Sequence, residues 1–472
     1  MARKFPLLEV AWATVARAGN ALERGLFQTD FPPDEFAARR AAIFDAIGAG
    51  AHALLQGAPP VRGFDVFRQT NEFYYCCGVE VPQAYLLLSG AKRRTTLYLP
   101  HRERRSIEGA ILTAEDAETA RQLTGADEVC GIESLGADLV WAATIYTPHA
   151  PAEGRMGCRD ELLRSDAKVA ADPWDGSAPR ESLFIGRLRQ LNPKAEVRNL
   201  SPVLDGLRAV KSPAEIALLR RAGGLSAMAV TEAMRITRPG LFEYQLGALA
   251  EYIYLFSGAR GDGYRPIIAG GANIWHAHYF RNYCPLKDGD MVLMDTAPDL
   301  GGYTSDIGRM WPVGGTYAPW QRELYGYIVE YHKATLKRIR PGVTADQIMD
   351  EAAAEMRGVV EKTQFSKSVY AEAAGRTLAF RGHLSHPVGM AVHDVGDYKP
   401  RPLAPGVVLT VDPQMWVPEE KLYIRVEDTV AVTDDGIENF TRSAPLELDD
   451  VEALMRDRRA PPPVFAEPHG RP

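Results

Sequence analysis

A short motif that occurs twice constrains the fold of this chain more than any other sequence feature. Arg238-Pro239-Gly240-Leu241 is followed by Gln245-Leu246. Arg340-Pro341-Gly342-Val343 is followed by Gln347-Ile348, 102 residues later (340 − 238). A stretch with helical spacing precedes each copy, and a second helical stretch and strands follow it. Because the whole order repeats, we expect two related halves that pack face to face.

Two aspartates in the first half lie where neighbouring strands would bring their carboxylates together. Asp295 ends an apolar run, and Asp306 follows a turn-forming stretch from Pro298 to Gly302. We expect adjacent antiparallel strands that aim both side chains at one point. Buried carboxylates at close range repel each other unless a cation neutralises them. The pair therefore predicts the floor of a metal site.

Three later stretches supply further candidate ligands. Residues 383–394 contain several histidines, Asp412 ends an apolar run, and Glu427 lies in an alternating strand. In that strand Arg425 and Glu427 share one face, and a charged pair facing inward is unusual unless it is neutralised. Four carboxylates and one imidazole suit Mn²⁺ or Co²⁺ better than a thiolate-bound zinc.

A pair of such ions predicts a reaction class. Two cations sharing Asp306 and Glu427 would lower the pKa of a bridging water and polarise a carbonyl group. Metal-assisted hydrolysis of an amide is therefore the expected chemistry.

Composition excludes several other classes of protein. The formal net charge of −7 offers no basic field for a nucleic acid, and no apolar run is long enough to span a membrane. The five cysteines show no CxxC spacing, so we expect buried thiols in a reducing cytoplasm. Residues 1–16 resemble a signal peptide only faintly, because Glu9 interrupts the apolar part. The predicted location is cytoplasmic.

The pattern of elements predicts an α+β chain of two domains and a tail. Residues 1–205 form a mixed α/β N-terminal domain, in which 147–180, rich in Pro, Gly, Asp and Arg, is an irregular excursion or linker. Residues 206–459 form the catalytic domain with its two halves. Residues 460–472 form an irregular tail.

The chain resembles a known family over roughly residues 33–458. It is similar to the proline-specific metallopeptidases of the methionine aminopeptidase-like group, and within it to the bacterial aminopeptidase P family. The motifs that carry the resemblance are Lys211-Ser212-Pro213-Ala214-Glu215-Ile216, Arg238-Pro239-Gly240, Asp288-Gly289-Asp290 through Asp295, Gly302-Tyr303 through Asp306, Ser385-His386, His393-Asp394-Val395-Gly396, Ile424-Arg425-Val426-Glu427-Asp428 and, near the N-terminus, Arg68-Gln69 with Phe73-Tyr74-Tyr75 and Gly78. The resemblance implies a pita-bread catalytic domain, in which helices cover an antiparallel sheet, after an α/β domain.

The resemblance also implies a role for each site residue. Asp295 is a ligand to one metal, His386 is a ligand to the other, Asp306 and Glu427 bridge both, and Asp412 stands where the fifth ligand belongs. The other implied site residues are His278 near the substrate amide, His393 bonded to the substrate or the tetrahedral intermediate, Arg425 on the substrate side, Trp416 and His383 in the substrate pocket, and Tyr264 behind a bridging aspartate.

The implied activity is removal of the N-terminal residue from peptides with proline in second position. A metal-bridging hydroxide would attack the Xaa-Pro amide, and Glu427, His278 and His393 would be the catalytic residues. The implied cofactors are two divalent ions, Mn²⁺ first, with Co²⁺ or Zn²⁺ as alternatives. The implied assembly is a homo-dimer or homo-tetramer.

One departure from the family pattern keeps other functions open. The family's fifth ligand is a glutamate followed by Pro-Gly, whereas this chain has Asp412-Pro413-Gln414. The aspartate is shorter by one methylene, about 1.5 Å of reach. The alternatives are a prolidase acting on Xaa-Pro dipeptides, a pita-bread enzyme with creatinase-like or lyase chemistry, and a metal-depleted binding protein. The family's N-terminal tryptophan-and-glycine signature is also reduced, to Ile107-Glu108-Gly109-Ala110.

Overall fold

The computed structural model describes residues 27–102, 111–457 and 459. The N-terminal stretch, the reduced signature at 107–110 and the predicted tail at 460–472 lie outside the described residues. The chain divides into two compact units, which are unit 1, Met1–Leu218 with Gly389–Gly396, and unit 2, Leu219–Val388 with Asp397–Pro472.

Unit 1 contains a mixed sheet with strand order β4-β3-β2-β1-β5-β6. The strands are β1 (Ala51–Gln56), β2 (Tyr85–Ser89), β3 (Arg94–Leu99), β4 (Glu128–Gly131), β5 (Thr144–Thr147) and β6 (Glu196–Asn199). The helices are α2 (Pro33–Ile47), α3 (Asn71–Cys77), α4 (Ala117–Thr124), α5 (Leu135–Leu139), α6 (Arg159–Ala171), α7 (Arg180–Leu191) and α8 (Ser201–Ala209), and α9 (Pro213–Ile236) begins here and continues into unit 2. Leu54, Leu87 and Ile145 pack with Leu188 of α7 in a buried core.

The stretch predicted to be irregular, 147–180, contains the 13-residue helix α6, so that prediction was wrong. The prolines and glycines that suggested a linker all lie outside Arg159–Ala171. Asp160 in the first turn and Lys168 in the last complement the helix dipole. The helix has no fully buried residue, so no apolar stripe marked it in the sequence.

Residues 389–396 belong to unit 1, although they follow a strand of unit 2 in the chain. Asp394 is buried between Arg208, at 2.5 Å, and Lys211, at 3.3 Å. Burial alone would raise the pKa of Asp394, but these two cations hold that pKa below its usual value. The segment is therefore anchored in unit 1 by buried charge pairs. A division of the chain into consecutive domains cannot represent it.

Unit 2 contains an antiparallel sheet with strand order β10-β11-β14-β9-β8-β7. The strands are β7 (Ile267–Gly270), β8 (Met291–Asp295), β9 (Ile307–Pro312), β10 (Leu384–Pro387), β11 (Val408–Val411) and β14 (Glu427–Val432), with β15 (Ile437–Asn439) paired to β14 and a separate hairpin of β12 (Gln414–Val417) and β13 (Leu422–Arg425). The strands β9 and β14 pair at the centre of the sheet. Outward from this pair, the first half contributes β9, β8 and β7, and the second half contributes β14, β11 and β10. This is the arrangement of two pseudo-symmetric halves.

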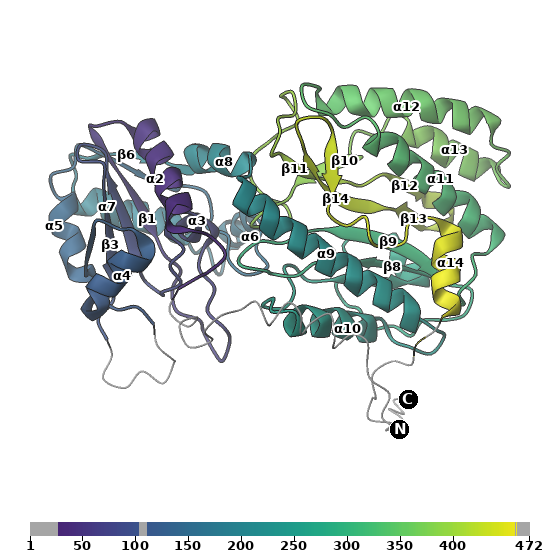
Figure 1. The fold of residues 1–472 in the computed structure, drawn as a ribbon, viewed down its shortest axis with the longest axis horizontal. Helices are drawn as coiled ribbons and strands as arrows, with labels where there is room; N and C mark the ends of the chain where they lie inside the picture. The colour runs from purple at the N-terminus through teal and green to yellow at the C-terminus, as the bar shows by residue number, and fades with distance from the viewer. Residues whose placement is uncertain (1–26, 103–110, 458, 460–472) are drawn as a thin grey trace. The chain divides into compact units, whose positions relative to one another are not determined.

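The helices of unit 2 follow the same symmetry. They are α9, α10 (Glu243–Phe256), α11 (Pro319–Leu336), α12 (Ala345–Lys362), α13 (Ser368–Thr377) and α14 (Leu448–Arg456). In Figure 1, α12 lies above the strands β10 and β11 with α11 and α13 beside them, and α10 lies below β8 and β9 with α9 running obliquely above it. Helix α12 begins 102 residues after α10 (345 − 243), which is the offset of the repeated motif.

Matching hydrogen bonds confirm the predicted two halves. Gly240 donates its backbone N–H to Leu286 at 2.9 Å, and Gly342 donates to Leu403 at 2.8 Å. Each glycine has a positive φ, +91° and +83°, which turns the chain from the first helix of a half into the second. The Arg-Pro-Gly motif is therefore the corner of each half.

Cysteine burial is less uniform than the sequence suggested. Cys76, Cys77 and Cys158 are buried, Cys130 is partly buried and Cys284 is exposed, and all carry free thiols. Among the described residues, no helix combines the length and apolar character that crossing a bilayer requires.

The corner glycine of the second half gives a test of this fold. Gly342→Ala should lower the free energy of unfolding by about 1–2 kcal/mol, because its φ of +83° disfavours a side chain even though a Cβ there meets nothing within 4 Å. Gly358→Ala, inside α12 and also in open space, should raise it by about 0.5–1 kcal/mol. Urea denaturation of both variants checks this, and a neutral Gly342→Ala would contradict the corner assignment.

Candidate metal centre

The central strands of unit 2 place the predicted acidic ligands side by side. Asp295 ends β8 and Glu427 begins β14, and both lie opposite Gly308 of β9. Asp306 comes two residues before Gly308, so it points to the same face. A Cβ on Gly308 would lie 3.0 Å from the Cβ of Glu427. The glycine therefore makes room for the carboxylates, a role that the sequence did not reveal.

Tyr264 joins the two aspartates of the predicted floor. Its hydroxyl lies 2.5 Å from Oδ1 of Asp295 and 2.7 Å from Oδ1 of Asp306. A hydroxyl between two carboxylates fixes their orientation and offsets part of their repulsion. The predicted antiparallel pairing of strands β8 and β9 is confirmed.

His386, on β10, faces two of these carboxylates. Its Nδ1 donates to the carbonyl of Pro387 at 3.2 Å. Its Nε2 is directed to Oδ2 of Asp306, at 3.4 Å, and to Oε1 of Glu427, at 3.8 Å. An imidazole whose second nitrogen bonds a backbone carbonyl is the usual arrangement of a metal-binding histidine. Ligand atoms of Asp306, His386 and Glu427 lie within 4.8 Å of one another, close enough to share one ion.

Glu427 carries the clearest sign of a cation at this point. Its carboxylate is fully buried, and Oε1 has no hydrogen-bond partner among the described residues. An unpaired buried oxygen costs free energy unless something neutralises it. The donor set of two carboxylates and one imidazole fits a hard or borderline divalent ion.

Arg425 occupies the other side of the cluster. Its Nε donates to Asp412 at 3.0 Å, one NH₂ group donates to Asp295 at 2.9 Å, and the other is in short contact with Oε2 of Glu427. Its guanidinium is buried among three carboxylates. Arg425 therefore links Asp295, Asp412 and Glu427 by its bonds to each of them.

Burial shifts the proton affinity of the acidic groups. Burial raises the pKa of Asp306 and of Glu427 well above the usual range, neighbouring carboxylates add to the effect, and Arg425 opposes it. Burial also raises the pKa of Asp412 to about 6, against the charge of Arg425. A cation that binds here must compete with protons, so its affinity must fall as the pH falls.

Comparison with known proteins agrees with this geometry. Residues 217–434 match the model of metallopeptidase family M24, and residues 36–145 match the N-terminal domain of aminopeptidase P. The Xaa-Pro aminopeptidase of Escherichia coli K12 is 32% identical over 89% of this chain and 97% of its own length. This chain belongs to metallopeptidase family M24.

Solved structures of the same family share the whole architecture. The zinc-substituted E. coli aminopeptidase P in complex with product has a TM-score of 0.74 at 31% identity, covering 91% of this chain and 100% of that one. Proline aminopeptidase P II from Yersinia pestis has a TM-score of 0.73 at 32% identity, covering 90% and 100%. The chain is thus a metallopeptidase of the aminopeptidase P type with the pita-bread fold, and the family implies divalent metal ions.

The two residues predicted to line the substrate pocket, Trp416 and His383, differ in their surroundings. Trp416 stacks on Tyr423, with ring centroids 4.1 Å apart, and meets Trp275 edge-on at 5.3 Å. His383 is fully buried, donates from Nε2 to the carbonyl of Thr377 at 2.8 Å, and accepts the backbone N–H of Asp412 on its own carbonyl. A substrate contact through the His383 ring would require that ring to become exposed.

The two histidines predicted to contact the substrate lie in different parts of the fold. His278 is exposed after the 3₁₀ turn Gly271–Trp275 and stacks on Phe280 at 5.9 Å. His393 lies in the segment that belongs to unit 1, where its Nδ1 is 3.2 Å from Asp160 of α6. Their proposed contacts with substrate stay predictions.

Sequence reasoning missed the support behind Glu427. Asp428, its neighbour on the opposite face of β14, is buried and paired with Arg309 at 2.6 Å and with Nε2 of His332 at 2.8 Å. Arg309 also donates to the carbonyl of Glu427 at 2.6 Å. The side chain of Asp428 is thus buried and paired with cationic and hydrogen-bonding groups. The apolar alternation of the strand was the only signal in the sequence.

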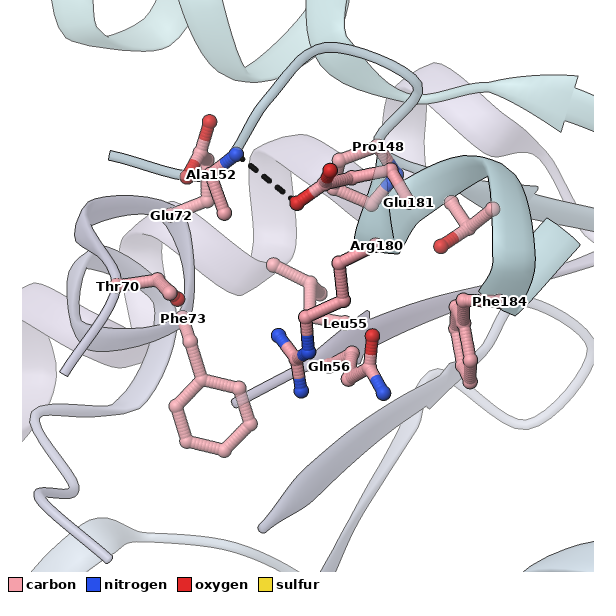
Figure 2. Close-up of a pocket in the computed structure, with 11 residues that line it drawn as sticks. Leu55, Gln56, Thr70, Glu72, Phe73, Pro148, Ala152, Arg180, Glu181 and Phe184 are labelled. Atoms are coloured by element: carbon pink, nitrogen blue, oxygen red, sulfur yellow. Dashed lines mark hydrogen bonds between the residues drawn. The ribbon is translucent and has the colours of Figure 1, made fainter. Parts of the chain in front are cut away.

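A small pocket in unit 1 is lined by residues of that unit. Figure 2 shows Arg180 of α7 extending toward Gln56 and Phe73, while Glu181 faces Ala152. Arg180 donates to the carbonyl of Gly57 at 2.7 Å, and Glu181 accepts the backbone N–H of Ala152. Arg180 and Glu181 are therefore engaged in structural bonds.

The buried His383 predicts a pH-dependent stability. Burial lowers the pKa of His383 from 6.5 to about 4, so the unfolded chain binds this proton first. The stabilisation is complete above about pH 6.5 and is lost as the pH falls towards 4. Between about pH 7.5 and 5 the wild type should lose about 2 kcal/mol more unfolding free energy than His383→Phe. Urea denaturation at both pH values measures this, and equal losses would contradict it.

Proposed function

We propose that this chain is a divalent-metal-dependent hydrolase that removes the N-terminal residue from peptides with proline in second position. The observation that carries the proposal is the open cluster of Asp306, His386 and Glu427, with the unpartnered Oε1 of Glu427 buried inside it. The names of the relatives, Xaa-Pro aminopeptidases from E. coli and Haemophilus influenzae, support the substrate class.

The residues present fit a metal centre of up to two ions. Asp306, His386 and Glu427 would hold the first, and Asp295 and Asp412 are the remaining ligands. Manganese is the expected metal, with cobalt or zinc as alternatives. When bound, divalent ions lower the pKa of water and polarise the substrate carbonyl.

The protein side chains do the positioning. Tyr264 keeps the carboxylates of Asp295 and Asp306 aligned, and Arg425 anchors Oε2 of Glu427 so that Oε1 faces His386. Orienting groups of this kind prepare a site before the substrate arrives.

The aromatic residues beside the cluster suit proline. Trp416 and Trp275 form an edge-to-face pair, and Tyr423 supports Trp416 from behind. The compact, apolar pyrrolidine ring packs well on such faces. We assign Trp416 to the substrate, His278 to the region of the scissile amide and His393 to the peptide, where Asp160 would fix its tautomer.

Location and assembly complete the proposal. We expect a cytoplasmic enzyme, although one relative, intermediate cleaving peptidase 55 of Arabidopsis thaliana, is named as mitochondrial. We expect a homo-dimer or homo-tetramer, which sedimentation of the purified chain would reveal.

Peptide assays test the activity directly. The full chain, stripped of metal and resupplied with Mn²⁺, should release Xaa from Xaa-Pro-Yaa and leave Xaa-Ala-Yaa intact. Cleavage of Xaa-Pro alone would identify a prolidase instead. No turnover of any proline peptide with Mn²⁺, Co²⁺ or Zn²⁺ would refute hydrolysis of this bond.

The central carboxylate supplies a matched mutational test. Glu427→Gln should lower kcat/KM for Xaa-Pro-Yaa by more than about 100-fold, because even groups that only orient ligands are worth 10–100-fold. Glu438→Gln, on the adjacent strand β15 and paired with exposed Arg220, should keep near-normal activity. Full activity in Glu427→Gln would show that this carboxylate is not part of the centre.

A further inference from the structure

A second group of side chains, in unit 1, has the composition of a metal site. One ligand atom each from Cys158, Asp160 and His393 lies within 4.8 Å of the other two. Cys158 is the N-cap residue of α6, and Asp160 lies in the first turn of that helix. His393 comes from the segment 389–396, which belongs to the same unit. We call these three residues the Cys158 triad.

Direct contacts hold the triad together. Nδ1 of His393 lies 3.2 Å from Oδ2 of Asp160, and the Cys158 thiol donates a hydrogen bond to the carboxylate of Asp160. Asp160 and His393 are 233 positions apart in the chain. The tertiary fold of unit 1, and not a local turn, therefore brings the imidazole to the helix.

The triad can be reached from solvent. The side chains of Asp160 and His393 are 44% and 28% exposed, whereas Cys158 is 7% exposed. An ion can therefore meet the carboxylate and the imidazole first and the sulfur behind them. Arg164 pairs with Asp160 at 3.1 Å, but Arg164 is largely exposed and is also bonded to Glu161. Such an exposed pair contributes little stability, so it does not prevent an ion from binding.

The sulfur of Cys158 can become an anionic ligand. Burial raises the pKa of the Cys158 thiol to about 12, and the neighbouring carboxylate of Asp160 adds to the effect. A bound cation reverses this balance, because a coordinating thiol loses its proton, here to solvent. The backbone N–H of Glu161, in the first turn of α6, is directed at the sulfur and favours the thiolate.

The three donor types select the metal. A sulfur, an imidazole nitrogen and a carboxylate oxygen are typical ligands of Zn²⁺, whereas Mn²⁺ prefers oxygen. Three protein ligands leave one position of a tetrahedral ion for water. The ligands proposed for the centre of unit 2 include no sulfur, so the two sites differ in the ion that they prefer.

We propose that the Cys158 triad is a zinc site of unit 1, with no ligand in common with the centre of unit 2. The ion replaces the hydrogen bond between Asp160 and His393 and ties the segment 389–396 to the N-terminus of α6. Ligation through Nδ1 of His393 does not use Nε2, the atom left for the peptide contact proposed above. The site does not depend on peptidase activity, because an inactive chain would bind zinc equally well.

Cadmium, a spectroscopic substitute for zinc, tests this site. Thiolate ligands give bound Cd²⁺ a charge-transfer band in the ultraviolet, which oxygen and nitrogen ligands do not. The reduced, metal-stripped full chain, with Mn²⁺ added to occupy the centre of unit 2, should show this band saturating at about one Cd²⁺ per chain. A large excess of Zn²⁺ should remove the band. A wild-type chain without the band, or a band that excess Zn²⁺ leaves unchanged, would overturn the proposal.

Variants identify the ligands. Cys158→Ser should abolish the band, and Asp160→Asn and His393→Ala should each weaken Cd²⁺ binding by at least about tenfold. Cys284→Ser, at an exposed thiol outside the triad, and Glu427→Gln, in the centre of unit 2, should keep the wild-type band. Circular dichroism shows whether each variant is folded, and Asp160→Asn and His393→Ala keep the thiol and test the site even where Cys158→Ser is unfolded. A full band in folded Cys158→Ser, or wild-type affinity in both Asp160→Asn and His393→Ala, would show that the triad does not bind the ion.

Discussion

Repulsion among buried carboxylates is the constraint on which the structure of unit 2 depends. Asp295, Asp306, Asp412 and Glu427 are each at most 4% exposed, and they converge on one side of a single sheet. Such a cluster is unfavourable unless positive charge or donated protons enter it. Tyr264 supplies a hydroxyl, Arg425 supplies a fixed cation, and one set of ligand atoms faces no described donor except an imidazole. The distribution of these compensating groups, rather than the acids alone, determines what the site can hold.

The pseudo-symmetry of the unit explains why the acids meet. Asp295 ends β8 and Asp412 follows β11, the second strand of each half counted outward from the centre. Asp306 precedes β9 and Glu427 begins β14, the innermost strand of each half. Each copy of the helix–helix–strand pattern thus places two acids at the junction between the two halves. Gly308, between β8 and β14, leaves the space that the paired side chains need.

Local sequence patterns predicted much of this arrangement, but they did not predict pairings between residues that are far apart in the chain. The repeat gave the two halves, and the strand–turn–strand pattern gave the Asp295–Asp306 floor. The bond between Arg309 and Asp428 joins residues 119 positions apart, and nothing in either stretch marks the other as its partner. Gln414 after a proline reads as an ordinary turn residue, so its bond to Asp412 became visible only with the β12–β13 register. Helix α6 lacks an apolar stripe and was hidden among prolines and glycines.

The segment 389–396 has a consequence for how such a gene can change. It carries Asp394 out of the catalytic half and into a buried position between Arg208 and Lys211, so the chain passes between the two units three times. Replacement of residues 1–218 by a sequence that lacks Arg208 and Lys211 would leave Asp394 as a buried charge without these two cations. A transplanted N-terminal unit must therefore bring both cations with it.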